Sequence, residues 1–386
     1  MTLDADTITR MVWLELGRAH SSDLATGLRA AEACGVRVLL ASAWRAEGKP
    51  LSSDVEEELA FWNGQIARYR IAYGLLEARI PSIEVQKGIA LQDLYPAGWI
   101  RDCGDLDLTL GSRRDVWAAA ALLREHGWDS PGCSLILVGD RLEVVVGLWQ
   151  SPPANRFSNE QRIELASIRF AGNSGTVPPC SQIVTSETPS ARIRHLLAIL
   201  EERFERTFGV RDVIDGSVLI QGAEAIEMRA FFATLDRLSL WPEWRHLLRR
   251  MRMLDADPRL PIGPLGPYVG ALARRGARWL AMQRHPARWA AELLDRLTVL
   301  RPPSDREAAL AWWIHTRVSV RSVLEANHPF YGYRLDEDAA ADDLELENRN
   351  GRLLARTPIG TYLMTYSGAV DARWLTSEDE ARLASS

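Results

Sequence analysis

The most constraining feature of the sequence is a short stretch, Asp105 to Leu110, in which polar and apolar residues alternate strictly. Alternation with a period of two predicts a β-strand with one buried and one exposed face. Asp105 and Asp107 then project from the same face, a few ångströms apart. Like charges this close repel each other, so the pair is favourable mainly when a cation lies between them. Mg²⁺ prefers oxygen ligands of this kind.

A glycine turn precedes this strand. Ser82 to Gln86 favours a short strand, Lys87-Gly88 a turn, and Ile89 to Tyr95 a short helix that Pro96 ends. Glycine lets the backbone approach a phosphate, and a helix N-terminus offers amide donors and partial positive charge. Only two of the 46 basic residues are lysines, so Lys87 is not the generic surface cation of this chain. The segment therefore contains the groups that a magnesium–triphosphate site needs.

The periodic patterns divide the chain into four regions. Its 386 residues exceed what one core usually holds, so two or three packed subdomains are expected. We predict an N-terminal helical region (1–78), a mixed α/β core (79–190), a helical domain (191–330) and a C-terminal tail (331–386). Asn350-Gly351 in the tail signals a small β hairpin. The predicted fold class is α+β, with a mixed sheet core flanked by helical regions.

Individual elements follow from the same periodicity. After the Asp105 strand we expect further strands over 134–138, 141–149 and 163–170. Helices are expected over 193–208, 213–219, 225–238, 243–254, 269–282, 287–300 and 306–323.

Composition and charge exclude several classes of protein. Hydrophobic residues make up 47% and charged residues 25%, as in globular proteins. A formal net charge of -5 argues against a protein that coats nucleic acid through overall positive charge. Acidic, polar sequence follows Met1, and no window approaches the apolar run of about 18 residues that a membrane span needs. We therefore expect a cytoplasmic protein without a membrane partner.

The order of these motifs resembles an uncharacterised nucleotidyltransferase family within the polymerase-β-like nucleotidyltransferase superfamily. Its members carry a lysine-glycine turn, a short helix, an arginine and an Asp-x-Asp strand, where the wider superfamily has Gly-Gly or Gly-Ser at the turn. The matching positions are Lys87, Gly88, Tyr95, Pro96, Arg101, Gly104, Asp105 and Asp107. The segment from Arg194 to Ile220 resembles the helical region after the catalytic core, and the resemblance spans roughly residues 75 to 255. It implies a nucleotidyltransferase fold.

The third carboxylate is the point at which the sequence departs from the family. The superfamily places it on a later strand, and many family members have an acidic residue near a His-Trp pair there. This chain has Trp149 but no histidine before it. Glu143 is the candidate third carboxylate, with Asp140 and Glu164 as alternatives.

The resemblance also implies roles for individual residues. The catalytic and metal-binding residues would be Asp105, Asp107 and Glu143, and the nucleotide-binding residues would be Lys87, Gly88, Arg101 and Gly104. Arg101 could instead pair with Asp105. The metal would be Mg²⁺ or Mn²⁺, and the co-substrate an NTP. A nucleoside monophosphate would pass to a hydroxyl or phosphate of a small molecule or peptide, as in natural-product tailoring.

Two alternatives stay open at this point. The first is a toxin-like transferase acting on tRNA or on a protein, with basic helices such as Arg245 to Arg252 forming the acceptor groove. That run is most simply the solvated face of an amphipathic helix, so a nucleic-acid partner is not favoured. The second is an inactive pseudoenzyme that serves as a binding scaffold.

Overall fold

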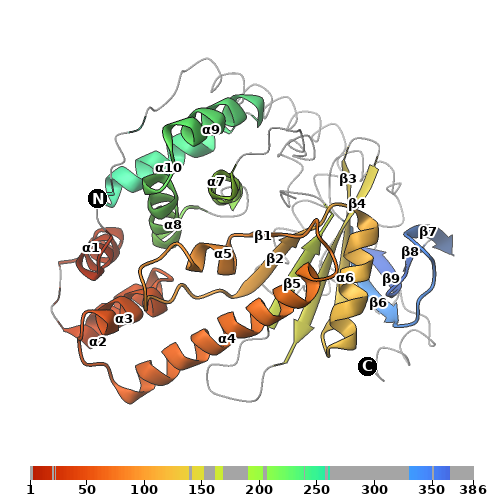
Figure 1. Ribbon diagram of the computed structural model, residues 1–386, viewed down its shortest axis with the longest axis horizontal. Helices are drawn as coiled ribbons and strands as arrows, with labels where there is room; N and C mark the ends of the chain where they lie inside the picture. Colours follow the sequence, from red (N-terminus) through yellow and green to blue (C-terminus); the bar gives the residue numbers. More distant parts are fainter. Residues whose placement is uncertain are drawn as a thin grey trace, which may run out of the picture.

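The computed structural model shows an α+β architecture, as the sequence patterns predict (Figure 1). Its strands form one nine-stranded sheet in the order β1-β2-β5-β4-β3-β6-β9-β8-β7. The residues that the structure describes are 3–19, 21, 23–138, 141–151, 161–167, 190–202, 207–238, 240–256, 260, 330–349 and 352–365.

Four helices precede the sheet: α1 (Ala5–Leu16), α2 (Leu24–Ala33), α3 (Arg37–Ala46) and α4 (Ser53–Glu77). The first two begin at aspartates whose side chains accept a hydrogen bond from a backbone N–H of the first turn, as N-caps do. Gly17 ends α1 in the left-handed conformation that glycine favours. The first three helices pack together, and α4 runs from them along the sheet (Figure 1).

Five strands form the part of the sheet that carries the candidate site. They are β1 (Glu84–Gln86), β2 (Asp105–Thr109), β3 (Asp129–Val138), β4 (Arg141–Gln150) and β5 (Gln161–Ala166). β1 is antiparallel to β2, and β2 is parallel to β5. β4 lies antiparallel between β5 and β3. The sheet is therefore mixed in direction in this part.

The two faces of this sheet differ in burial. Apolar side chains such as Leu106, Leu108 and Leu165 are fully buried on the face that α6 (Arg113–Glu125) covers. Ser112 caps the start of α6, and α4 lies beside it over the same face (Figure 1). The residues between them on β2 and β5 point to the other face, where Asp105, Arg162 and Glu164 are exposed and Asp107 is half-buried. Thr109 and Ala166, at the ends of these two strands, are buried. The sequence alternation thus predicted the two-faced strand correctly.

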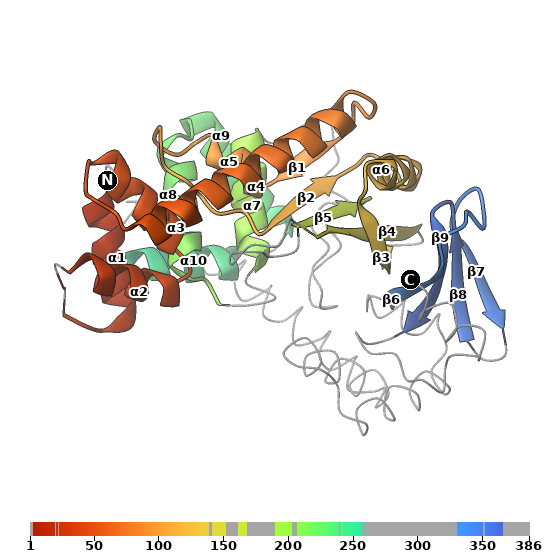
Figure 2. The ribbon, with the colours of Figure 1, turned by 90° about the horizontal axis from the view of Figure 1, so that it is seen from below.

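The C-terminal strands extend the same sheet instead of forming a separate tail. They are β6 (Phe330–Asp336), β7 (Glu345–Arg349), β8 (Arg352–Thr357) and β9 (Gly360–Thr365), and β6 pairs with β3 (Figure 2). β7 and β8 pair antiparallel, as a hairpin does, although positions 350 and 351 lie outside the described residues. Pairing of β6 with β3 therefore joins this region to the core sheet, across the boundary predicted at 331.

Four helices follow the core: α7 (Ala191–Glu202), α8 (Val210–Gln221), α9 (Ala225–Leu238) and α10 (Trp241–Met253). α8 contacts α1, so the helices on either side of the core in sequence meet in space. The further helices predicted over 269–282, 287–300 and 306–323 lie outside the described residues. Within the part of the chain that is described, no helix is both long and apolar enough to cross a membrane.

Candidate functional site

Three carboxylates lie on the exposed face of the two parallel strands β2 and β5. β2 and β5 are in a register that pairs Asp105 with Arg162 and Asp107 with Glu164. Paired residues on neighbouring strands project to the same face. Asp105, Arg162 and Glu164 are exposed and Asp107 is half-buried. We call Asp105, Asp107 and Glu164 the carboxylate row.

Glu143 lies away from this row. The register of β4 places Gly147, not Glu143, beside Glu164. Glu143 is four residues further along β4, about 13 Å away at the rise of a strand. Its buried carboxylate accepts a hydrogen bond from the Ser167 hydroxyl at 2.6 Å and lies 3.5 Å from the Arg141 guanidinium. The register therefore places Glu164, and not Glu143, beside Asp107. The other alternative, Asp140, lies outside the described residues.

The Lys87-Gly88 turn lies against the start of the row. Gly88 begins α5 (Gly88–Gln92), and a Cβ added to it would lie 3.5 Å from the Asp105 carbonyl oxygen. Both residues have positive φ angles, 52° for Lys87 and 47° for Gly88. This conformation is easy for glycine but strained for lysine. A strained residue of this kind persists only where its surroundings hold it in place.

His195 on α7 supplies such a constraint. Its Nδ1 accepts a hydrogen bond from the Lys87 backbone N–H at 3.1 Å. Burial, followed by the positive charge of Arg194, lowers the pKa of His195 to about 4, so its imidazole is neutral near pH 7. A neutral imidazole has one nitrogen free to accept, as this bond requires. No pattern in the sequence indicates this contact, because His195 and Lys87 are 108 positions apart.

The Arg101 side chain is paired inside the protein. It is buried, and it donates to Asp215 on α8 through Nε at 2.9 Å and Nη2 at 2.7 Å. The Tyr95 hydroxyl donates to the same carboxylate at 2.5 Å. Burial opposes ionisation of Asp215, but Arg101 outweighs it and lowers the pKa of this carboxyl. Arg101, Asp215 and Tyr95 form a buried cluster, which we call the Arg101 cluster. The guanidinium thus pairs with Asp215 and not with Asp105, and its contact with a phosphate stays a prediction.

Gly104 is exposed next to Asp105, and its carbonyl accepts a hydrogen bond from the Tyr69 hydroxyl at 2.9 Å. The same hydroxyl accepts from the backbone N–H of Arg162 at 3.1 Å. Tyr69 on α4 therefore links the beginnings of the two strands that carry the carboxylate row. No pattern in the sequence indicates these bonds, because the bond partners of Tyr69 come from distant segments.

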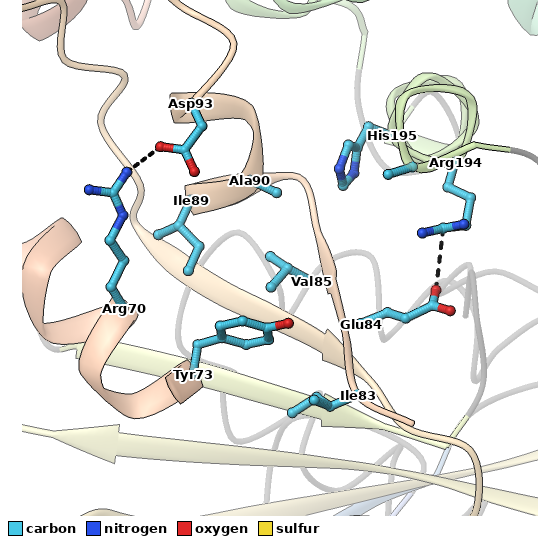
Figure 3. Close-up of a pocket in the computed structure, with 11 residues that line it drawn as sticks. Arg70, Tyr73, Ile83, Glu84, Val85, Ile89, Ala90, Asp93, Arg194 and His195 are labelled. Atoms are coloured by element: carbon cyan, nitrogen blue, oxygen red, sulfur yellow. Dashed lines mark hydrogen bonds and ion pairs between the residues drawn. The ribbon is translucent and has the colours of Figure 1, made fainter. Parts of the chain in front are cut away.

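A cleft of about 360 Å³ opens on the other side of β1, between α4, α5 and α7 (Figure 3). Its lining includes Val85, which pairs with Leu108, and Glu84, which pairs with Thr109, so both faces of the edge strand β1 contribute to the cleft. Figure 3 shows one ion pair on each side of it, Arg70 with Asp93 and Arg194 with Glu84. His195 belongs to both places: it lines the cleft, and it accepts the hydrogen bond from the Lys87 backbone N–H.

The basic run from Arg245 to Arg252 lies on α10 and is only partly available to a partner. Arg250 donates to Glu15 on α1 at 2.5 Å and to the Phe208 carbonyl at 3.1 Å, which ties α10 to its neighbours. Arg249 and Arg252 are exposed. The run therefore serves packing as well as the surface.

The donor set of the carboxylate row suits a hard divalent cation, because all its groups are oxygen ligands. Among the described residues, no three or more His, Cys, Asp or Glu side chains lie close enough together to hold a metal ion.

No protein-family model, curated protein or solved structure matches this chain. The functional argument therefore proceeds from the geometry of the site.

Proposed function

We propose that this chain is a magnesium-dependent nucleotidyltransferase. It would move a nucleoside monophosphate from an NTP to a hydroxyl or phosphate of a small-molecule or peptide acceptor. The observation that carries the proposal is the register of β2 and β5, which aligns Asp105, Asp107 and Glu164 on one exposed face. The Lys87-Gly88 turn lies beside this face. An Asp-x-Asp strand with a third carboxylate from a later strand is also what the nucleotidyltransferase fold would require.

The metal would be Mg²⁺ or Mn²⁺, held by Asp105, Asp107 and Glu164. The support for this is the chemistry of the three oxygen ligands and the strand register that brings their backbones together. When bound, the cation would neutralise phosphate charge and polarise the phosphorus.

The side chains of this chain have separate tasks in the transfer. Gly88 lets the phosphates approach the backbone, and Lys87 contributes positive charge toward the leaving pyrophosphate. Glu164 accepts the proton of the acceptor hydroxyl as its oxygen attacks the α-phosphorus. A new phosphorus–oxygen bond forms to the acceptor, and the bond to pyrophosphate breaks.

Thermal unfolding with each NTP, with and without Mg²⁺, tests the nucleotide site. A ligand at 100 times its Kd stabilises the native state by about 2.7 kcal/mol. We expect a magnesium-dependent rise in melting temperature that Asp107→Ala loses. Transfer of a radiolabelled α-phosphate to an acceptor would then establish the reaction. If no nucleotide shifts the wild-type melting temperature, the proposal fails.

One observation favours a second candidate, an inactive binding scaffold. The expected phosphate ligand Arg101 is buried in an ion pair with Asp215. An inactive scaffold would bind neither Mg²⁺ nor any NTP, whereas the enzyme would bind both. Isothermal titration calorimetry with each ligand distinguishes the two candidates.

A further inference from the structure

The cleft beside β1 has the size and the walls of a small-molecule site. Its volume of about 360 Å³ lies at the lower end of the range of about 300–1,000 Å³ that such sites occupy. Apolar side chains from α4, α5, β1 and the residue before β1 form most of its walls: Tyr73, Ile83, Val85, Ile89 and Ala90. A few polar groups lie among them, and these decide which ligand the cleft fits.

One of these polar groups is buried and faces the cleft. His195 is 6% exposed, and Figure 3 shows its ring between α5 and α7. Because Nδ1 accepts from the Lys87 backbone N–H, the neutral imidazole carries its proton on Nε2. The described residues supply no hydrogen-bond acceptor to Nε2. A buried N–H without an acceptor costs free energy, which an acceptor on a bound molecule would recover.

The beginning of α7 adds positive charge beside His195. Ala191 is the first residue of this 12-residue helix, and it lines the cleft. The backbone N–H groups at a helix start carry partial positive charge and attract anions. The Arg194 guanidinium also lines the cleft, one residue before His195. The helix start, Arg194 and the Nε2–H of His195 together suit a carboxylate.

Negative charge lies at the same end of the cleft. Glu84 on β1 pairs with Arg194, with 3.3 Å between Oε2 of the glutamate and Nε of the arginine. On the other side of the cleft, Arg70 pairs with Asp93 (Figure 3). The lining thus contains two guanidinium groups and two carboxylates, which balance each other. A zwitterion preserves this balance, whereas a ligand with a net charge would leave one group uncompensated.

We propose that the cleft binds an α-amino acid with a large apolar side chain. The carboxylate of the ligand accepts from the Nε2–H of His195 and lies beside Arg194. Its ammonium group faces Glu84, and its side chain packs against Val85 and Ile89. This inference goes beyond the proposed function and is independent of it, because the lining of the cleft includes no member of the carboxylate row.

Isothermal titration calorimetry with L-phenylalanine, 3-phenylpropionate and phenethylamine tests the class of ligand. The second probe lacks the ammonium group, and the third lacks the carboxylate. We expect the wild type to bind L-phenylalanine at least about tenfold more tightly than either analogue, because each analogue loses one charge-assisted contact. If L-phenylalanine does not bind, or if either analogue binds as tightly, the proposal is overturned.

Two variants locate the site, and a third is their control. Glu84→Gln keeps the shape of the side chain but removes the charge that faces the ammonium group. It should weaken binding of L-phenylalanine about tenfold and leave 3-phenylpropionate bound as in the wild type. Ala191→Phe, at an exposed position of the lining, fills the cleft and should abolish binding. Ala118→Phe, exposed on α6, should bind as the wild type does.

Melting temperatures show which variants are folded. If Ala191→Phe melts as the wild type does and still binds L-phenylalanine, or if Ala118→Phe also loses binding, the ligand lies elsewhere and the proposal is overturned. Equal weakening of L-phenylalanine and 3-phenylpropionate by Glu84→Gln overturns it as well, and this comparison decides even if Ala191→Phe does not fold. None of these titrations contains Mg²⁺ or a nucleotide, so failure of the proposed function leaves their outcome unchanged.

Discussion

Arg101 in the Arg101 cluster and Asp105 in the carboxylate row lie four residues apart in sequence and have opposite surroundings. Arg101 and Asp215 are buried and neutralise each other through two short hydrogen bonds. Asp105, at the start of the row, is exposed. The difference shows that charged residues close together in one motif can have different surroundings: the cluster joins the core to α8, and the row stays accessible to solvent.

The largest expected effect is on the stability of the cluster. Arg101→Ala leaves Asp215 buried without its charged partner, which should lower the free energy of unfolding by about 3–5 kcal/mol. Asp105→Asn, in the exposed row, should change it by less than about 0.5 kcal/mol. Urea unfolding of both variants measures the contrast. Equal losses of stability in the two variants would mean that the buried Arg101 contributes no more to folding than the exposed Asp105.

The next largest effect is on activity. Asp107→Asn keeps the shape of the side chain but removes its charge, so the rate of nucleotide transfer should fall about 100- to 1,000-fold, or about 3–4 kcal/mol of transition-state stabilisation. The melting temperature without ligand should stay close to that of the wild type. Steady-state transfer assays measure the rate, and a fully active variant would remove Asp107 from the site.

Glu164 and Glu143 form a matched pair for the third carboxylate. Glu164→Gln should slow transfer about 100-fold, because an amide cannot accept the acceptor proton. Glu143→Gln should leave kcat unchanged and lower stability by about 1 kcal/mol, since it weakens the hydrogen bond from Ser167. Transfer rates and urea unfolding are measured on both variants. If only Glu143→Gln loses activity, the assignment from strand register is wrong.

A smaller effect, on the pH dependence of the free energy of unfolding, is expected from His195. The unfolded chain binds a proton at an ordinary pKa of 6.5, but the buried His195 does so only near 4. Its contribution to stability is therefore complete above pH 6.5 and is lost as the pH falls toward 4. The loss by pH 5 should be about 2 kcal/mol.

The control for this effect is His195→Asn, which cannot titrate in this range but can still accept a hydrogen bond from the Lys87 N–H. Unfolding free energies of wild type and variant are compared between pH 5 and 7.5. The wild type should lose more stability at low pH. Parallel curves for the two proteins would show that His195 does not titrate as its burial implies.

Local patterns in the sequence predicted much of the site. Alternation in the Asp105 stretch predicted the half-buried strand, and the structure has β2 there. The lysine-glycine pair predicted a turn before a short helix, and α5 begins at Gly88. These features follow from interactions between residues close in sequence, which periodicity and backbone preference reveal.

The partners of these residues could not be predicted in the same way. Asp215, the partner of Arg101, is 114 positions away, and the third carboxylate depended on the register between β2 and β5. Glu143 and Glu164 both occupy alternating strands, so alternation alone gave no reason to choose Glu164. A strand fixes which face a side chain takes, but it does not fix which strand lies beside it.

The sequence by itself thus determined the α+β class, the two-faced Asp105 strand and the glycine turn, because each depends on chemistry within a few residues. Only the tertiary structure decided that Arg101 is buried, that Glu164 joins Asp107 and that His195 contacts the Lys87 turn. It also joined the C-terminal strands to the core through β3 and β6. The physical reason is that burial and register arise from contacts between distant segments, and these are set when the whole chain packs.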